Sequence, residues 1–181
     1  EFRRVLFRSV AFEFFMRSDY LPEDQKPALA RVTLADVLSI RSRDTLEQEE
    51  ARLIRFGAAN VLRSASYSDA TREVIRHFNE TVLEFERGRI TKNRVLEAIA
   101  TLGAMETEEA AARLTDYLEL LNTYTERDRP YDTQILLATI RNLELLGSPS
   151  SYNALFYTTL LDNYPDRIRD AAREASRSVS R

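Results

Sequence analysis

Apolar residues recur every three or four positions over most of this chain, a spacing typical of amphipathic α-helices. In the segment NRVLEAIATLG, for example, Val95, Leu96, Ile99 and Leu102 fall on one side of a helix. The alternation of β-branched and polar residues that marks strands is missing. We therefore predict an all-α protein with helices within residues 10–18, 26–42, 45–64, 68–88, 93–103, 107–124, 131–147, 148–163 and 165–179.

Polar residues mark the starts of several predicted helices. Thr45 and Gln48 have the spacing of a capping box, in which two side chains satisfy free backbone N–H groups. Thr107 and Ser148 are placed to cap the segments that follow them. Pro149 suits the first position of a helix, because it has no N–H group to leave unpaired.

Three of the four glycines mark helix ends. Gly88, Gly103 and Gly147 each follow an apolar stripe, and glycine commonly ends a helix by adopting a left-handed conformation. The second and third of these are 44 residues apart. Helix pairs that recur about every 40–47 residues are typical of HEAT and armadillo solenoids. The expected units are residues 45–88, 91–124, 131–162 and, in part, 165–181.

The segment PDRIRDAAREA resembles the first helix of a HEAT repeat. The residues that carry the resemblance are Asp166, Ile168, Arg169, Ala171, Ala172 and Ala175. The resemblance implies a right-handed α-α superhelix of the HEAT or armadillo type, in which layers of two helices bury each other's apolar faces. It also implies that Asp166 and Arg169 join a ladder of polar contacts between repeats.

The first nine residues, EFRRVLFRS, resemble the translated end of a widely used short-read sequencing adapter. We therefore expect residues 1–9 to be an artefact and the helical domain to span residues 10–181. Residues 1–9 carry a net charge of +2, so the remainder carries −5 against −3 for the whole chain. This interpretation also implies that the chain is the C-terminal part of a longer protein, so that its sequence indicates no cellular compartment.

Composition narrows the classes of function. With 181 residues, of which 44% are hydrophobic, the chain suits one folded domain. It has no cysteine, which excludes disulfides and thiolate chemistry. No apolar run approaches the roughly 18 residues that span a bilayer. Only Lys26 and Lys92 are lysines, so the other 24 basic residues are arginines, a bias that fits arginine codon usage better than a surface built to bind phosphate.

Residues that could carry catalysis are scarce. The glycines are isolated, so there is no phosphate-binding glycine loop. His77 is the single histidine, in a helix and without a nucleophile signature nearby, and we expect it on the surface or partly buried. The acidic clusters Glu47, Glu49, Glu50 and Glu106, Glu108, Glu109 lie at helix starts, where negative charge suits the helix dipole. We predict no catalytic residues, no metal and no cofactor.

Tyrosines concentrate in the second half of the chain, and tyrosine and arginine are favoured at protein interfaces. A candidate interface comprises Arg113, Tyr117, Tyr124, Arg127, Arg129 and Tyr131. The alternative is that these tyrosines pack between repeats with their hydroxyl groups at the rim.

The sequence therefore favours a non-catalytic helical-repeat scaffold or adaptor that binds a protein partner. One alternative is a HEAT-like module that binds nucleic acid through Arg72, Arg76, Arg87 and Arg89, although the net negative charge argues against it. Another is an accessory region of an enzyme whose catalytic part lies elsewhere. We also expect an apolar surface within residues 10–45 that favours self-association.

Overall fold

A computed structural model describes residues 2–42 and 44–180, and for residues 2–9 the backbone alone. Within these residues all regular structure is helical, as predicted. The α-helices are α1 (Phe2–Arg17), α2 (Lys26–Val37), α3 (Thr45–Ser64), α4 (Thr71–Glu86), α5 (Lys92–Gly103), α6 (Glu108–Glu126), α7 (Thr133–Leu146), α8 (Tyr152–Leu160) and α9 (Asp166–Val179). Two short 3₁₀ helices, η1 (Ser68–Ala70) and η2 (Pro149–Ser151), precede α4 and α8.

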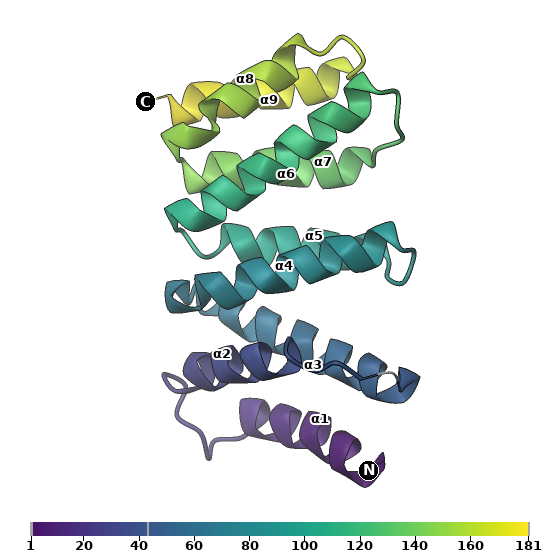
Figure 1. The fold of residues 1–181 in the computed structure, drawn as a ribbon. Helices are drawn as coiled ribbons and strands as arrows, with labels where there is room; N and C mark the ends of the chain where they lie inside the picture. Colours follow the sequence, from purple (N-terminus) through teal and green to yellow (C-terminus); the bar gives the residue numbers. More distant parts are fainter. Residues whose placement is uncertain (1, 43, 181) are drawn as a thin grey trace.

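The helices form two layers. The odd-numbered helices α1, α3, α5, α7 and α9 pack in chain order against one another, and the even-numbered helices α2, α4, α6 and α8 form the second layer. Neighbours within a layer run in the same direction, and consecutive helices run in opposite directions (Figure 1). The helices before Gly103 and Gly147, α5 and α7, thus lie side by side in matching orientation, as their spacing predicts.

The core lies between the layers and runs the length of the stack. Apolar residues from successive helices supply it: Ile99 and Leu102 of the predicted stripe in α5 are fully buried, as are Leu62, Leu118 and Ile140. Each such side chain contributes about 1.5–3 kcal/mol through burial. A single helix pair would leave much of this surface in water, so the stack depends on neighbouring pairs.

The helix starts agree with the sequence at two of three sites. The Thr107 hydroxyl accepts a hydrogen bond from the Ala110 N–H at 3.2 Å, and that of Ser148 accepts one from the Ser150 N–H at 3.3 Å at the start of η2. The predicted capping box at Thr45 is wrong, because Asp44 is the cap and accepts from the Leu46 N–H at 2.8 Å. A carboxylate one residue earlier replaces the threonine hydroxyl in this role.

Two of the three predicted glycine stops have the expected left-handed backbone. Gly88 has φ +68° and Gly147 φ +64°. Gly103 is different: it is the last helical residue of α5, and Ala104 follows as the cap. A Cβ at Gly103 would lie 2.0 Å from the Asn142 side-chain oxygen on α7. This glycine therefore permits the close approach of α5 and α7 and does not end the helix through its own backbone.

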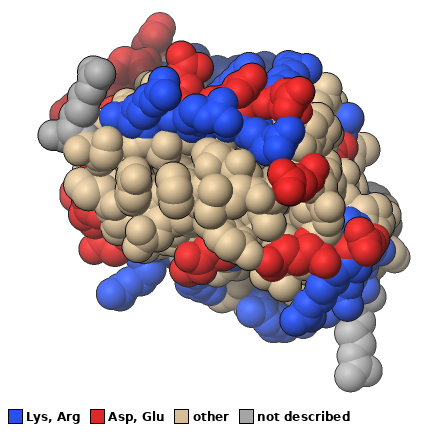
Figure 2. Space-filling view, turned by 90° about the horizontal axis from the view of Figure 1, so that it is seen from above, with Lys and Arg blue, Asp and Glu red and all other residues tan. Residues whose placement is uncertain are grey.

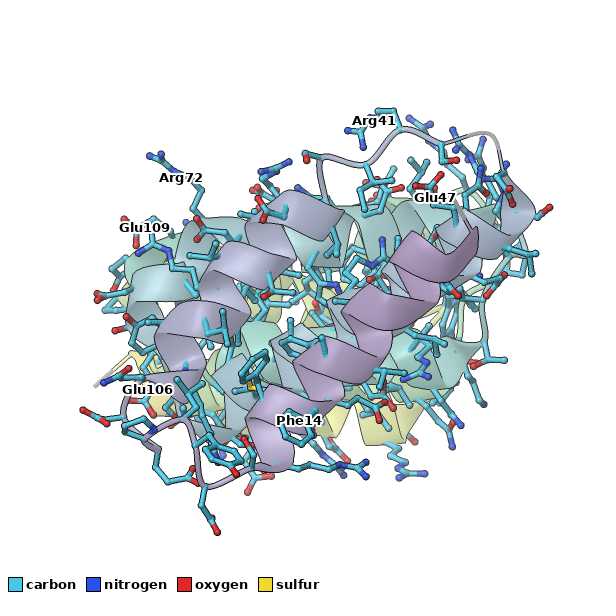
Figure 3. The ribbon with its side chains drawn as sticks, turned by 90° about the horizontal axis from the view of Figure 1, so that it is seen from below. Phe14, Arg41, Glu47, Arg72, Glu106 and Glu109 are labelled. Atoms are coloured by element: carbon cyan, nitrogen blue, oxygen red, sulfur yellow. The ribbon has the colours of Figure 1, made fainter. Side chains whose placement is uncertain are left out.

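The first helix starts earlier than predicted. Residues 2–9, which the sequence assigns to an adapter, form the first half of α1, and their side chains and Glu1 lie outside the described part of the structure. Farther along, Val10, Phe14, Phe15, Tyr20 and Val32 are exposed large apolar residues. Phe14 lies on the outer face of α1 (Figure 3). The predicted apolar surface is therefore present, and the self-association that we expect from it stays a prediction.

Candidate functional site

Two residues of the predicted tyrosine–arginine interface belong to the packing between α4 and α6. Tyr117 is only 4% exposed, and its ring meets that of Phe78 edge-on at 5.2 Å. Arg113 covers the other part of Phe78, with its guanidinium carbon 4.9 Å from the ring centre, and its Nε donates to Asn79 Oδ1 at 2.7 Å. Burial raises the pKa of the Tyr117 hydroxyl. Tyr117 is thus a core residue and offers no surface to a partner.

The other residues of that set lie at the end of α6 and in the loop after it. The Tyr124 hydroxyl donates to Glu86 on α4 at 3.2 Å, and the Arg129 guanidinium lies 5.6 Å from the Tyr124 ring centre. Tyr131 packs edge-on against buried Tyr164 at 5.2 Å. Arg127 is exposed. The structure therefore splits the predicted patch into a buried part and a loop part, and an interface at the loop part stays a prediction.

The repeat signature in α9 is largely internal. Ile168, Ala172 and Ala175 are buried, and small residues here let α9 approach α7 and α8 closely. Arg169 binds Asp162 at 3.1 Å and Asp166, and both partners lie within seven residues of it. The expected ladder between repeats is therefore not formed by Arg169, which instead fixes the turn between α8 and α9.

A polar ladder does exist, but it joins other residues, on even-layer helices and at their starts. Pairs about one repeat apart are linked by hydrogen bonds: Thr71 with Thr107 at 3.2 Å, Thr115 with Ser151 at 3.0 Å, and Asn122 with Thr158 at 3.1 Å. Each pair is separated by 36 residues. Sequence reasoning missed it, although hydroxyl or amide residues repeated at this interval were visible as a signal.

The same register places three large apolar side chains in one row on the outside of the even layer. Leu83, Leu120 and Phe156 are 38%, 37% and 46% exposed, and they stand 37 and 36 residues apart. We call these three residues the apolar row. At its α8 end, Phe156 stacks on Tyr152 with ring centres 5.9 Å apart and planes within 9°. Figure 2 looks onto the α8–α9 end of the stack, where a band without charge is bordered by charged residues on both sides.

His77 is fully buried, against our expectation of a surface or partly buried position. It points from α4 into the space between α3 and α5, where its ring meets Phe56 edge-on at 4.9 Å. Neither ring nitrogen has a hydrogen-bond partner among the described residues. Burial, together with the positive charges of Arg55 and Arg94, lowers the pKa of His77 to about 3. The imidazole is therefore neutral at physiological pH.

A cavity of about 340 Å³ lies beside His77. Its lining includes Arg63, Arg94 and Glu97, and the Arg94 guanidinium lies 4.5 Å above the Phe56 ring centre. Arg94 is paired with Glu97 at 2.8 Å. Among the described residues, no nucleophilic side chain makes a hydrogen bond to His77.

A second cavity, of about 380 Å³, lies where α2 and α4 end and α3 begins. Its charged lining consists of five arginines and two glutamates, and we call this site the arginine cleft: Arg41, Arg52, Arg55, Arg87, Arg89, Glu80 and Glu84. Glu84 on α4 binds both Arg52, at 3.2 Å, and Arg55 on α3. Arg41 projects from the connection between α2 and α3, near Glu47 (Figure 3).

The comparisons with known proteins come out empty. No family model, curated protein or solved structure gives a significant match to this chain. Among the described side chains, no three histidine or acidic residues gather as a metal site, and the predicted acidic clusters stay at helix starts. One of their members, Glu108, accepts a hydrogen bond from the Ser148 hydroxyl at 2.7 Å. None of the helices in the described part has the length and hydropathy of a membrane span.

The arginines of the nucleic-acid alternative do not form one surface. Arg72 and Arg76 lie in the first half of α4, whereas Arg87 and Arg89 follow its end. At a rise of about 1.5 Å per residue, Arg72 and Arg87 are separated by roughly 22 Å along the helix. They therefore lie at opposite ends of α4, and Arg72 lies well apart from Arg41 in Figure 3.

Proposed function

We propose that this protein is a non-catalytic scaffold of the HEAT or armadillo type, with a right-handed superhelix, that binds a protein partner through the outer face of its even layer. The observation that carries the proposal is the apolar row, in which each of three successive even helices exposes a large apolar side chain at the same register. Single exposed apolar residues are ordinary, but an aligned set beside stacked aromatic rings is typical of an interaction surface.

The residues around the apolar row favour a protein as the binding partner rather than a charged ligand. Tyr152 and Tyr157 add exposed aromatic area next to Phe156, and the Tyr157 hydroxyl is held by Glu126. Aromatic anchors with charged residues at the rim are the usual anatomy of a protein interface. The ladder beneath the row is made of neutral hydrogen bonds, so the face is held rigidly without buried charge.

Selection of ligands from a displayed library of protein fragments tests the proposal. We expect the selected fragments to lose binding by about tenfold or more when Leu120→Glu or Phe156→Glu places a charge in the row. Leu145→Glu is the matched control, because Leu145 is 80% exposed but lies on α7 in the odd layer. If no fragment is enriched, or if the control weakens binding as much as the row variants, the even face is not the binding surface.

A further inference from the structure

The arginine cleft holds more positive charge than its own carboxylates neutralise. Arg52 and Arg55 share Glu84, and Arg52 also binds Glu49. Arg41, Arg87 and Arg89 make no ion pair with any described carboxylate. This local excess stands out in a chain whose net charge is −3.

A buried donor at the cleft is also unused. The Arg55 side chain is 6% exposed, and its Nη2 binds Glu84, but its Nε is buried without a partner among the described residues. An unpaired buried donor costs about 1–3 kcal/mol unless something satisfies it. This cost, together with the three unpaired arginines that line the same cleft, favours a site for a group outside the protein fold.

The backbone arranges the free arginines around the cleft. Gly88, with φ +68°, turns the chain back after α4, and the Arg89 N–H donates to the Glu84 carbonyl at 2.9 Å. Arg87 and Arg89 therefore both line the cleft. On the other side, Arg41 Nη1 donates to the carbonyls of Leu38 and Ile40 at 3.0 and 3.1 Å, which holds its guanidinium in place.

From this geometry we propose that the arginine cleft binds a small organic molecule with two or more phosphate or carboxylate groups. Guanidinium groups bind such oxyanions through paired hydrogen bonds. The cavity, at about 380 Å³, is within the usual range of small-molecule sites. Its uncharged wall, which includes Val37, Leu38 and Leu83, suits the carbon skeleton of such a ligand.

An extended nucleic acid fits this place less well. Glu47, Glu49 and Glu50 follow in the first turns of α3 beside the cleft, and Glu86 and Glu126 lie at the ends of the neighbouring even helices. A phosphate backbone that continued beyond the cleft would run past these carboxylates. The positive region is therefore matched to a compact anion. The cleft shares Leu83 with the apolar row of the proposed protein interface, but none of its arginines belongs to that row.

The three unpaired arginines, Arg41, Arg87 and Arg89, also follow the C-terminal ends of α2 and α4, where positive charge interacts favourably with the helix dipole even without a ligand. The loop after α6 provides a control for that role, because Arg127 and Arg129 follow α6 as Arg87 and Arg89 follow α4, 40 residues earlier. The control loop does not line the cleft. A ligand site and a helix-end role therefore make different predictions for the two pairs.

Isothermal titration calorimetry with pyrophosphate, citrate, inorganic phosphate and a short DNA duplex, at physiological salt, tests the proposal. We expect pyrophosphate or citrate to bind, and Arg87→Gln/Arg89→Gln or Arg41→Gln to weaken binding by about tenfold or more, while Arg127→Gln/Arg129→Gln changes it by less than about twofold. The stronger of the two probes shows whether the site takes phosphate or carboxylate. All these positions are exposed, so the variants should fold.

Three results would overturn the proposal. If neither pyrophosphate nor citrate binds, the cleft is not an anion site. If both double variants weaken binding equally, the effect is diffuse charge rather than a site. If only the duplex binds, the arginines belong to a nucleic-acid surface. Equal losses of melting temperature in the two doubles, without ligand binding, would identify the helix-end role.

Discussion

The two halves of the molecule bury different kinds of polar groups. In the first half, α3 and α4 enclose the ion pairs of Glu84 and leave His77 and Arg55 Nε buried without partners, next to two cavities. In the second half, α6 and α8 are joined by neutral hydrogen bonds such as that between Asn122 and Thr158, and only the neutral Thr125 hydroxyl is buried without a partner among the described residues. There α5 and α7 approach so closely that Gly103 has no room for a Cβ.

This difference indicates which part of the helical stack is suited to binding a ligand. Neutral hydrogen bonds and close packing give stability that does not depend on pH or ligand. Buried charges and unsatisfied donors are costly to maintain, and such costs gather at sites that bind something. We therefore expect the second half to be the rigid base of the stack and the first half to respond to charge, pH and ligands.

The largest effect should come from removing the charge of Glu84. We expect Glu84→Gln to destabilise the protein by about 3–5 kcal/mol, because it strips two largely buried arginines of a shared counter-ion. Denaturant unfolding followed by circular dichroism measures the change. Glu97→Gln is the control: its pair with Arg94 is roughly 40–50% exposed on both sides, and such pairs contribute about 0–1 kcal/mol. Equal losses in both variants would mean that buried charge does not hold the first half together.

The second-largest effect should come from replacing a half-buried helical glycine by alanine, and it should differ between the two halves. We expect Gly103→Ala to destabilise by about 1–3 kcal/mol, because its Cβ would overlap the Asn142 side chain, which is itself held by the Ala138 carbonyl. Gly57→Ala in α3 meets only Phe12 of α1 at 3.3 Å, and the terminal helix can shift. There the gain in helix propensity, about 0.5–1 kcal/mol, should prevail.

Both variants are compared by the midpoint of thermal unfolding. The midpoint should fall for Gly103→Ala and hold or rise for Gly57→Ala. If Gly57→Ala also lowers it, the first half is packed as closely as the second, and the contrast between the halves fails at this level.

The regular part of the fold could be predicted from the sequence because it rests on local patterns. The leucine stripes, the Thr107 cap and the left-handed Gly147 are each determined by a few neighbouring residues, and all are found as expected. Gly103 shows the limit of such reasoning. Its position after an apolar stripe indicates the end of a helix. The structural reason for glycine there is instead that a Cβ would overlap the side chain of Asn142, about 40 residues away.

The sites could not be predicted, because they depend on which helices meet. The arginine cleft combines residues from the ends of two helices and the start of a third, and the net negative charge of the chain conceals its local excess. Tyr117 and Arg113 look like interface residues by type, yet the pairing of α4 with α6 encloses them around Phe78. The residue types indicate what these side chains can bind, but only the packing of the helices determines whether each side chain is buried or exposed.

The smallest expected effect is the pH response of His77, a buried group of the first half. Its pKa is about 3 in the folded protein and 6.5 as the ordinary value, so the unfolded chain takes up a proton first as pH falls. Stability is then unaffected above about pH 7 and lost progressively between pH 6.5 and pH 3. At pH 5.5 the loss from this group alone should be on the order of 1 kcal/mol relative to pH 8.

His77→Leu isolates this contribution from the carboxylates, which titrate in both proteins. The guanidiniums of Arg55, Arg63 and Arg94 near His77 carry the same charge across this range. The carboxylate of Glu97, which lines the cavity beside His77, is present in both proteins, so its titration is common to both. We expect the free energy of unfolding of wild type minus that of His77→Leu to fall between pH 8 and pH 5.5, whatever the absolute effect of the substitution. A difference that stays constant with pH would mean that His77 is charged or hydrogen-bonded in the folded protein. The cavity beside it would then be occupied by water or a ligand rather than left as an unsatisfied interior.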